Sequence, residues 1–141
     1  MRLTLHTDYA LRVLVHVGLR NGDLVTITEI ADCYEISKNH LTKVVHQLGR
    51  IGYLETVRGK YGGVRLLKNP EDVALGKFIR EVEEDFALVR CMRCNVVEDC
   101  RLNNNRCVAR DALEAGLAAF FKVLDTYTLA DMLESERKAA Q

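Results

Sequence analysis

The chain has a single proline, no long hydrophobic run and no net charge across its 141 residues. Its longest apolar stretch, residues 13–17, is interrupted by His16, whereas a membrane-spanning helix needs about 20 apolar residues. The N-terminal residues also lack the apolar segment of a signal peptide. We therefore expect a soluble, cytoplasmic protein without a membrane partner. Hydrophobic residues make up 48% of the chain, which is enough for a folded core and argues against global disorder.

The zero net charge conceals a division along the chain. Residues 1–70 carry 10 Lys and Arg against 6 Asp and Glu, whereas residues 71–141 carry 10 against 14, so the two halves have charges of +4 and −4. The basic excess is concentrated between Ile36 and Lys68, where seven basic residues are balanced only by Glu55. This local segment is a candidate for contacts with nucleic acid, which the average charge alone would argue against.

The scarcity of proline and of β-branched runs favours a mainly helical chain, in which apolar spacing places the elements. Thr26 and Glu29 fit a capping box at the start of one helix. Ser37 fits the N-cap of the next, so the short break before it makes a helix–turn–helix. Two β segments around the glycine-rich basic loop 58–63 predict a hairpin. The expected helices are 7–20, 26–34, 38–51, 75–82, 111–125 and 128–133, and the expected strands are 53–57 and 64–67.

A helix–turn–helix followed by a basic hairpin is the order of elements in a winged-helix DNA-binding domain, which we assign to residues 1–70. The second helix would enter the major groove, and the hairpin, or wing, would lie beside the backbone or in the minor groove. Asn39 can pair with adenine edges, and lysines on the same helix can contact guanine or phosphate. Basic wing residues supply affinity that is independent of sequence. The predicted DNA contacts are Ser37, Lys38, Asn39, His40, Lys43, Arg58, Gly59, Lys60 and Arg65.

Four of the five cysteines fall within seventeen residues, at positions 91, 94, 100 and 107. In a reducing compartment such clustered thiols are more often metal ligands than disulfides, and thiolates suit both zinc and iron–sulfur clusters. Only one C-x2-C pair is present, which weakens the zinc interpretation without excluding it. The same pair would suit a thiol-redox enzyme, but no βαβ pattern surrounds it, and we predict no enzymatic activity. Cys33 is expected in the core, and His16 is expected to have its hydrogen bonds satisfied.

Several segments are similar to one known family. Residues 1–4 and 7–12 (MRLT and TDYALR) resemble its N-terminus, and residues 57–66 (VRGKYGGVRL) resemble its wing. On these motifs the chain resembles the Rrf2 family (Rrf-two) of winged-helix, iron–sulfur transcription regulators. Residues 88–91, the clustered cysteines and residues 124–131 (LDTYTLAD) are most similar to its nitric-oxide-sensing branch. The branches that respond to cluster status and to iron are near relatives.

The resemblance implies a homodimer crossed by a long helix, at about residues 108–126, which follows a cluster-binding loop at about 84–107 and precedes a short terminal helix. These elements together form a second unit, residues 71–141. The resemblance also implies a [4Fe–4S] cluster, with [2Fe–2S] as an alternative, and places Arg12 near it. The chain has four clustered cysteines where the family has three, so Cys94 is an alternative first ligand, and a four-cysteine set that leaves Asp8 free stays open. The implied ligands are Cys91, Cys100, Cys107 and the partner subunit's Asp8.

Together these features predict a dimeric repressor that binds a double-stranded DNA operator under the control of an iron–sulfur cluster that senses nitric oxide. One alternative is a regulator of the same family that responds to cluster status or to iron. The other is a DNA-binding protein with a structural zinc site.

Overall fold

The computed structural model of the protein describes residues 2–93 and 107–140. It confirms the expected fold class, a mainly helical winged helix–turn–helix with a long additional helix. In the part of the chain that is described, no helix is both long and apolar enough to cross a membrane. The elements are α1 (Leu5–Leu19), α2 (Ile27–Tyr34), α3 (Lys38–Arg50), β1 (Leu54–Val57), β2 (Gly63–Leu66), η1 (Pro70–Asp72), α4 (Leu75–Val82), α5 (Arg90–Arg93), α6 (Val108–Leu124) and α7 (Leu129–Ala139).

Threonine side chains mark the starts of α2 and α7. Thr26 accepts a hydrogen bond from the Glu29 N–H at 3.1 Å, as a capping box requires. The predicted box is only half formed, because the Glu29 carboxylate pairs with Arg20 on α1. A complete capping box forms at the start of α7, between Thr128 and Asp131. The caps therefore fix both helix starts, and at α2 the acidic residue also ties the helix to α1.

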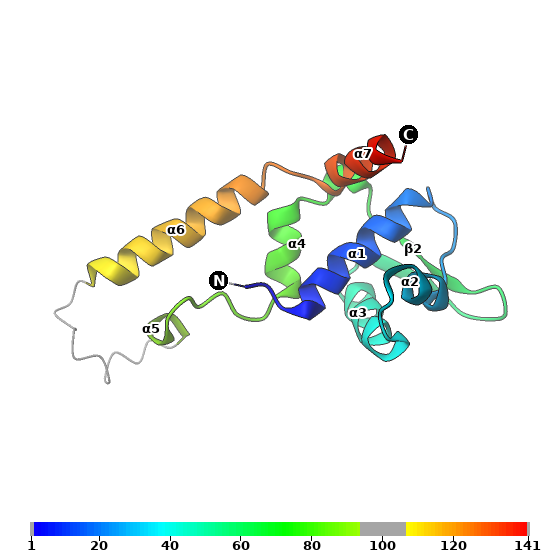
Figure 1. The fold of residues 1–141 in the computed structure, drawn as a ribbon, viewed down its shortest axis with the longest axis horizontal. Helices are drawn as coiled ribbons and strands as arrows, with labels where there is room; N and C mark the ends of the chain where they lie inside the picture. The colour runs from blue at the N-terminus through cyan, green and yellow to red at the C-terminus, as the bar shows by residue number, and fades with distance from the viewer. Residues whose placement is uncertain (1, 94–106, 141) are drawn as a thin grey trace.

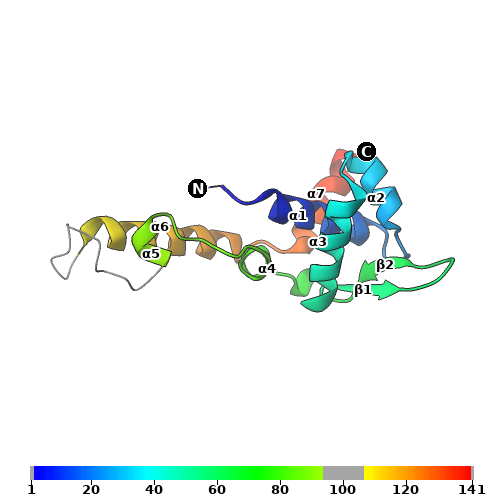
Figure 2. The ribbon, with the colours of Figure 1, turned by 90° about the horizontal axis from the view of Figure 1, so that it is seen from below.

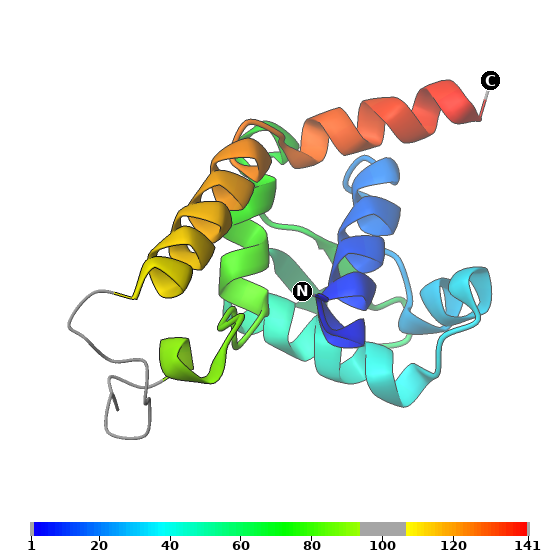
Figure 3. The same ribbon diagram turned by 60° about the vertical axis from the view of Figure 1, so that its left-hand side comes forward.

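Helix α1 lies at the centre of the core, where α3 and α7 pack against it and β2 contacts it (Figure 3). Gly18 permits the close approach of α7, because a Cβ there would lie 2.9 Å from the Leu133 side chain. A short antiparallel bridge between Val25 and Val64 holds the base of the hairpin against the segment before α2. The α1 and α3 side chains buried in this core are Ala10, Val13, Leu14, Val17, Leu41, Val44, Val45 and Leu48.

Helix α6 extends away from this core, and the hairpin lies at the opposite end of the molecule (Figures 1 and 2). Phe121 is the buried residue of α6, near its C-terminal end. The rings of Phe86 and Phe120 pack edge-on against the Phe121 ring, with centroids 4.8 and 5.2 Å away. The long helix is therefore held at one end, where it meets α4.

Several boundaries differ from the sequence-based expectation. Helix α1 begins at Leu5 rather than at residue 7, and α6 begins at Val108 rather than at residue 111, where apolar spacing predicted its start. Helix α7 runs to Ala139 rather than ending near residue 133. Its last turns contain good helix formers and a Lys138–Glu134 ion pair at 2.5 Å, and these stabilise a helix without an apolar periodicity that would reveal it. Within the segment expected as a loop, α5 forms one turn, and residues 94–106 lie outside the described residues.

Candidate functional site

Helix α3 presents a polar, basic face to solvent. Ser37 accepts a hydrogen bond from the His40 N–H at 3.3 Å and fixes where the helix begins. Glu35, with φ of 53°, turns the chain between α2 and α3. Because the apolar side of α3 is buried in the core, its polar side must face outward. The five residues predicted to contact DNA from this helix are all exposed: Ser37, Lys38, Asn39, His40 and Lys43.

The hairpin concentrates its positive charge at its tip. Arg58, Gly59 and Lys60 are exposed there. Arg65, also predicted to contact phosphate, lies in β2 opposite Glu55 and forms an ion pair with it at 2.7 Å. The charge of Arg65 in β2 is therefore balanced by that of Glu55 in β1. The exposed basic residues at the tip, Arg58 and Lys60, contribute more to the attraction of the wing for a polyanion.

Asp8 and Arg12 lie on the solvent side of α1. Their side chains are about half exposed and form an i,i+4 ion pair with the Arg12 Nε and Asp8 Oδ2 atoms 3.0 Å apart. The Arg12 guanidinium also lies 5.7 Å from the centre of the Tyr34 ring on α2. Helix α1, which carries Asp8, packs directly against α3. A contact that moves Asp8 would therefore also move α3.

Two of the predicted thiol ligands flank the segment between α5 and α6. Cys91 lies on α5 and Cys107 is the N-cap residue of α6, and both are free and half-buried. The pKa of Arg110, in the first turn of α6, is raised chiefly by its hydrogen bond to Glu114 and by the charge of Glu114, with a further contribution from Cys91. Cys107 thus lies at the N-terminal end of α6, and Cys91 is near enough to the first turn of this helix to influence the Arg110 guanidinium.

The remaining predicted ligands are not brought to these thiols within the described residues. Cys94 and Cys100 lie outside the described residues, and Asp8 pairs with Arg12. Within residues 2–93 and 107–140, no three His, Cys, Asp or Glu side chains gather closely enough to hold a metal ion. A complete ligand set built on Cys91 and Cys107 therefore requires the other cysteines or a second chain.

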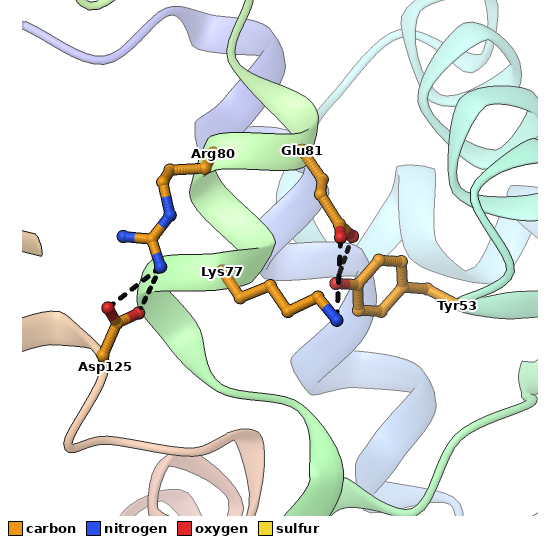
Figure 4. Close-up of polar contacts among 5 residues, drawn as sticks. All are labelled: Tyr53, Lys77, Arg80, Glu81 and Asp125. Carbon is orange, nitrogen blue, oxygen red and sulfur yellow. Dashed lines mark hydrogen bonds and ion pairs between the residues drawn. The ribbon is translucent and has the colours of Figure 1, made fainter.

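Helix α4 connects the two ends of the molecule (Figure 4). On one side, the Arg80 Nη2 donates to both carboxylate oxygens of Asp125, at 2.7 and 2.9 Å, just after α6 ends. On the other side, the buried Tyr53 hydroxyl donates to Glu81 at 2.6 Å, just before the wing begins. Gly76 makes room for the first contact, because a Cβ there would lie 2.2 Å from the Asp125 Oδ1. Helix α4 therefore contacts both the residue that precedes the wing and the residue that follows α6.

Glu83, directly after α4, holds the N-terminal turn of α1. Its Oε2 accepts hydrogen bonds from the Thr4 N–H and hydroxyl, at 2.9 and 3.0 Å, and from the Thr7 hydroxyl at 2.7 Å. Partial burial opposes ionisation of Glu83, but the hydrogen bonds from Thr7 and Thr4 lower its pKa overall. The segment that leads from α4 to Cys91 is thereby tied to the turn that carries Asp8.

The outer face of α6 carries small and apolar side chains. Its two ends are well exposed, at 79% for Val108 and 58% for Val123. A Cβ added at Gly116 would have no heavy atom within 4 Å in the described chain. Small residues at helical spacing allow another helix to approach closely. The exposed residues of this outer face are Val108, Ala112, Ala115, Gly116, Ala119 and Val123.

Residues 3–135 match the model of the Rrf2 family, described as an iron-dependent transcriptional regulator. The chain belongs to the Rrf2 family. An Rrf2 relative from Bacillus licheniformis, the HTH-type transcriptional regulator NsrR, is 45% identical over 137 residues, which cover 96% of this chain and 94% of the relative. The NsrR of Geobacillus kaustophilus is also 45% identical, over 95% of this chain and 90% of the relative. The chain is thus a DNA-binding transcriptional regulator and not an enzyme, as predicted.

Solved structures share the Rrf2 fold at lower identity. IscR from T. potens superposes with a TM-score of 0.77 at 23% identity, covering 100% of this chain and 92% of that structure. CymR of B. subtilis gives a TM-score of 0.74 at 22% identity, covering 96% of this chain and 98% of that structure. These matches support the winged-helix fold and the extended α6 of this Rrf2 member.

Two expectations about single residues were wrong. Cys33 is exposed, because α2 turns Ile30 and Ala31 toward the core. His16 has a buried Nε2 without a hydrogen-bond partner in the described chain, and the Glu29 Oε1 is 3.8 Å away. Sequence reasoning also omitted exposed α3 residues that share the predicted DNA face. These residues are Thr42, His46 and Arg50. They could have been identified because they are polar and recur at helical spacing on the same side as Lys43.

Proposed function

We propose that this Rrf2 regulator is a homodimeric repressor whose operator binding is controlled by an iron–sulfur cluster that senses nitric oxide. Residues 1–70 would bind DNA, and residues 71–141 would hold the cluster and the dimer contact. The observation that carries the proposal is the pair of half-buried free thiols, Cys91 and Cys107, at the end of α6 farther from α4. They flank a segment with two further cysteines, and α4 and Glu83 connect this segment to the DNA-binding half.

The donor chemistry of these residues fits an iron–sulfur cluster. Thiolates are the usual protein ligands of such clusters, and Cys91, Cys100 and Cys107 would supply three of them, with Cys94 as the alternative first ligand. The partner subunit's Asp8 would supply the fourth, to a [4Fe–4S] cluster in preference to [2Fe–2S]. When bound, the cluster supplies iron that nitric oxide can reach, most readily where the ligand is oxygen.

The exposed position of Asp8 suits it for a contact with another subunit. In the single chain its carboxylate pairs with Arg12, which is one turn further along α1. A partner contact at Asp8 would fix α1, and α1 supports α3 through their shared core. When that contact is lost, Asp8 can again form its ion pair with Arg12. Helices α1 and α3 are then free to shift together. Half-sites must be roughly 34–36 Å apart, so a small rotation is enough to weaken operator binding.

The outer face of α6 is the proposed contact between the two subunits. Its residues are exposed and small, and Gly116 opens the centre of the face. A second α6 packed there would bury the apolar side chains that the chain itself leaves in water. This arrangement would bring the α1 of one subunit toward the thiols of the other.

Iron and acid-labile sulfide, measured after anaerobic purification, test the proposed thiol ligands. We expect both in the unsubstituted protein and in Cys33→Ser, and loss of both in Cys107→Ser. Cys33 provides the matched control because its thiol is exposed on α2, outside the proposed site. A colourless protein with stoichiometric zinc and no sulfide would support the structural-zinc alternative instead.

Nitric oxide titration with parallel absorbance and DNA-binding measurements tests the signal. We expect nitric oxide to change the absorbance and to release DNA over the same concentration range, and Asp8→Ala to alter this response. An unchanged response in Asp8→Ala would exclude Asp8 as a ligand. DNA release by iron chelation but not by nitric oxide would favour the iron-responsive alternative.

A further inference from the structure

The tip of the wing is a tight turn over residues 59–62. The Gly62 N–H donates to the Gly59 carbonyl at 3.0 Å, and Gly59 has φ of +116°, a conformation that favours glycine. A Cβ at Gly62 would lie 2.2 Å from the Val57 carbonyl oxygen, so this position also requires glycine. The turn therefore has a defined backbone that presents its two central residues, Lys60 and Tyr61, to solvent.

Tyr61 is exposed to an unusual degree for an aromatic residue. It is 84% exposed, whereas Tyr127 is 52% exposed and Tyr53 is 2% exposed. Its ring contact in the structure is with the neighbouring Lys60, whose Nζ is 5.7 Å from the ring centre. Tyr61 thus makes no contribution to the core, although an exposed aromatic ring is unfavourable in water. A rigid turn that displays such a ring is suited to binding a partner surface at low entropic cost.

We propose that Tyr61 enters the minor groove of DNA and favours A·T base pairs there. This inference rests on the proposed placement of the wing on DNA. The exposed Arg58 and Lys60 beside Tyr61 are attracted to the negative potential of the groove and bring the tip to it. The ring packs against the deoxyribose walls, and the hydroxyl donates a hydrogen bond to the adenine N3 or thymine O2. The guanine 2-amino group obstructs the same position in a G·C pair.

Three duplexes that differ in their grooves test this assignment: alternating A·T, alternating G·C and alternating inosine·C. Inosine lacks the 2-amino group, so inosine·C resembles A·T in the minor groove but G·C in the major groove. We expect Tyr61→Ala to lower affinity for the A·T and inosine·C duplexes about fivefold, and for G·C much less. The dependence of affinity on salt concentration should be unchanged, because the tyrosine carries no charge. Tyr61→Phe should retain most of the affinity but lose the preference for A·T and inosine·C.

Lys60→Ala separates this inference from the proposed function. It should weaken binding to all three duplexes similarly and flatten the salt dependence by about one unit. If Lys60→Ala has this effect and Tyr61→Ala has none, the assignment of Tyr61 is overturned while the wing stays on DNA. If neither variant changes binding, the proposed placement of the wing fails as well. Equal losses with Tyr61→Ala on all three duplexes would overturn minor-groove recognition.

Intrinsic fluorescence gives an independent measurement, because the chain has five tyrosines and no tryptophan. We expect the A·T duplex to quench part of the tyrosine emission. Tyr61→Phe should remove most of this quenching, and Tyr127→Phe, which alters an exposed tyrosine after α6, should retain it. Quenching that persists in Tyr61→Phe would contradict a direct contact between Tyr61 and DNA.

Discussion

Helices α3 and α6 have comparable lengths, 13 and 17 residues, but they depend on the rest of the chain to very different degrees. Helix α3 buries four apolar residues against α1 and the hairpin, whereas α6 buries only Phe121. Tertiary packing supplies most of the stability of a helix in water, so α3 is stabilised within its own chain. Helix α6 displays small apolar residues on its outer face and is suited to packing against a second chain.

The largest effect should come from placing a charge on the outer face of α6. Ala119→Glu keeps a good helix former but introduces a carboxylate where a second α6 is proposed to pack. We expect a monomer in analytical ultracentrifugation and a loss of operator affinity of about 100-fold, since two linked half-site contacts become independent.

The matched control is Ala139→Glu, the same substitution at the exposed end of α7. It should remain dimeric and bind the operator normally. A dimeric Ala119→Glu protein would exclude the outer face of α6 as the subunit contact.

A smaller effect is expected from Gly62→Ala in the wing. The added methyl group would overlap the Val57 carbonyl oxygen, so the turn must rearrange, with an expected cost of about 2 kcal/mol in the free energy of unfolding. DNA affinity should also fall, because the tip residues are displaced. Gly49→Ala, where the nearest atom is 3.8 Å from the new Cβ, should be tolerated. Equal stability of the two variants in urea unfolding would contradict the close approach at Gly62.

Gly76→Ala tests the connection between the two regions. Its Cβ would displace the Asp125 carboxylate and with it the bidentate contact from Arg80. We expect a loss of about 1 kcal/mol in the free energy of unfolding, since the ion pair is partly exposed.

The matched control is Gly116→Ala, whose new Cβ meets no neighbour in the described chain. This variant should stabilise a monomeric α6 by up to about 1 kcal/mol. Denaturant unfolding of both variants in the monomeric Ala119→Glu background would compare their free energies of unfolding without a contribution from the subunit contact.

The smallest expected effect is a pH dependence that originates in the DNA-binding half. Burial, and then the charge of Arg20, lowers the pKa of His16 below its ordinary 6.5. Between that lowered pKa and 6.5 the unfolded chain binds more protons than the folded one, so stability falls as pH decreases through this window.

His16→Phe should flatten this fall and raise stability at neutral pH by about 1 kcal/mol, because it removes a buried nitrogen that has no hydrogen-bond partner among the described residues. Phenylalanine also retains the edge contact with Tyr34, at 5.6 Å between ring centres. Thermal unfolding from pH 7 to pH 5 gives the comparison. An unchanged slope in His16→Phe would show that another group controls this window.

Features that depend on neighbouring residues were predictable from the sequence. The Ser37 cap, the break before it and the glycine-rich turn around Lys60 each act within a few positions, so a linear pattern contains them. The Arg80–Asp125 contact spans 45 positions and Thr4–Glu83 spans 79, and no local pattern indicates which side chains will meet.

The wrong expectations have the same physical origin. Cys33 is apolar by type, but the orientation of α2 against α1 decides which side of that helix is buried. The end of α7 is helical through charged residues that have no apolar face to reveal it. The predicted ligand set also remained a prediction, because Cys94 and Cys100 lie outside the described residues and Asp8 faces solvent.

The contact between Arg80 and Asp125 fixes the C-terminal end of α6, so the helix can tilt about this point, its pivot. At about 1.5 Å per residue, the 17 residues of α6 extend roughly 25 Å from this pivot to the cysteine at its start. A tilt of about 5° at the pivot moves the far end by about 2 Å, comparable to the helix shifts of about 1–2 Å seen in allosteric transitions. If Cys107 holds a cluster as proposed, a rearrangement of only a bond length or two there would correspond to a few degrees of rotation beside α4, where the wing and α1 are also attached.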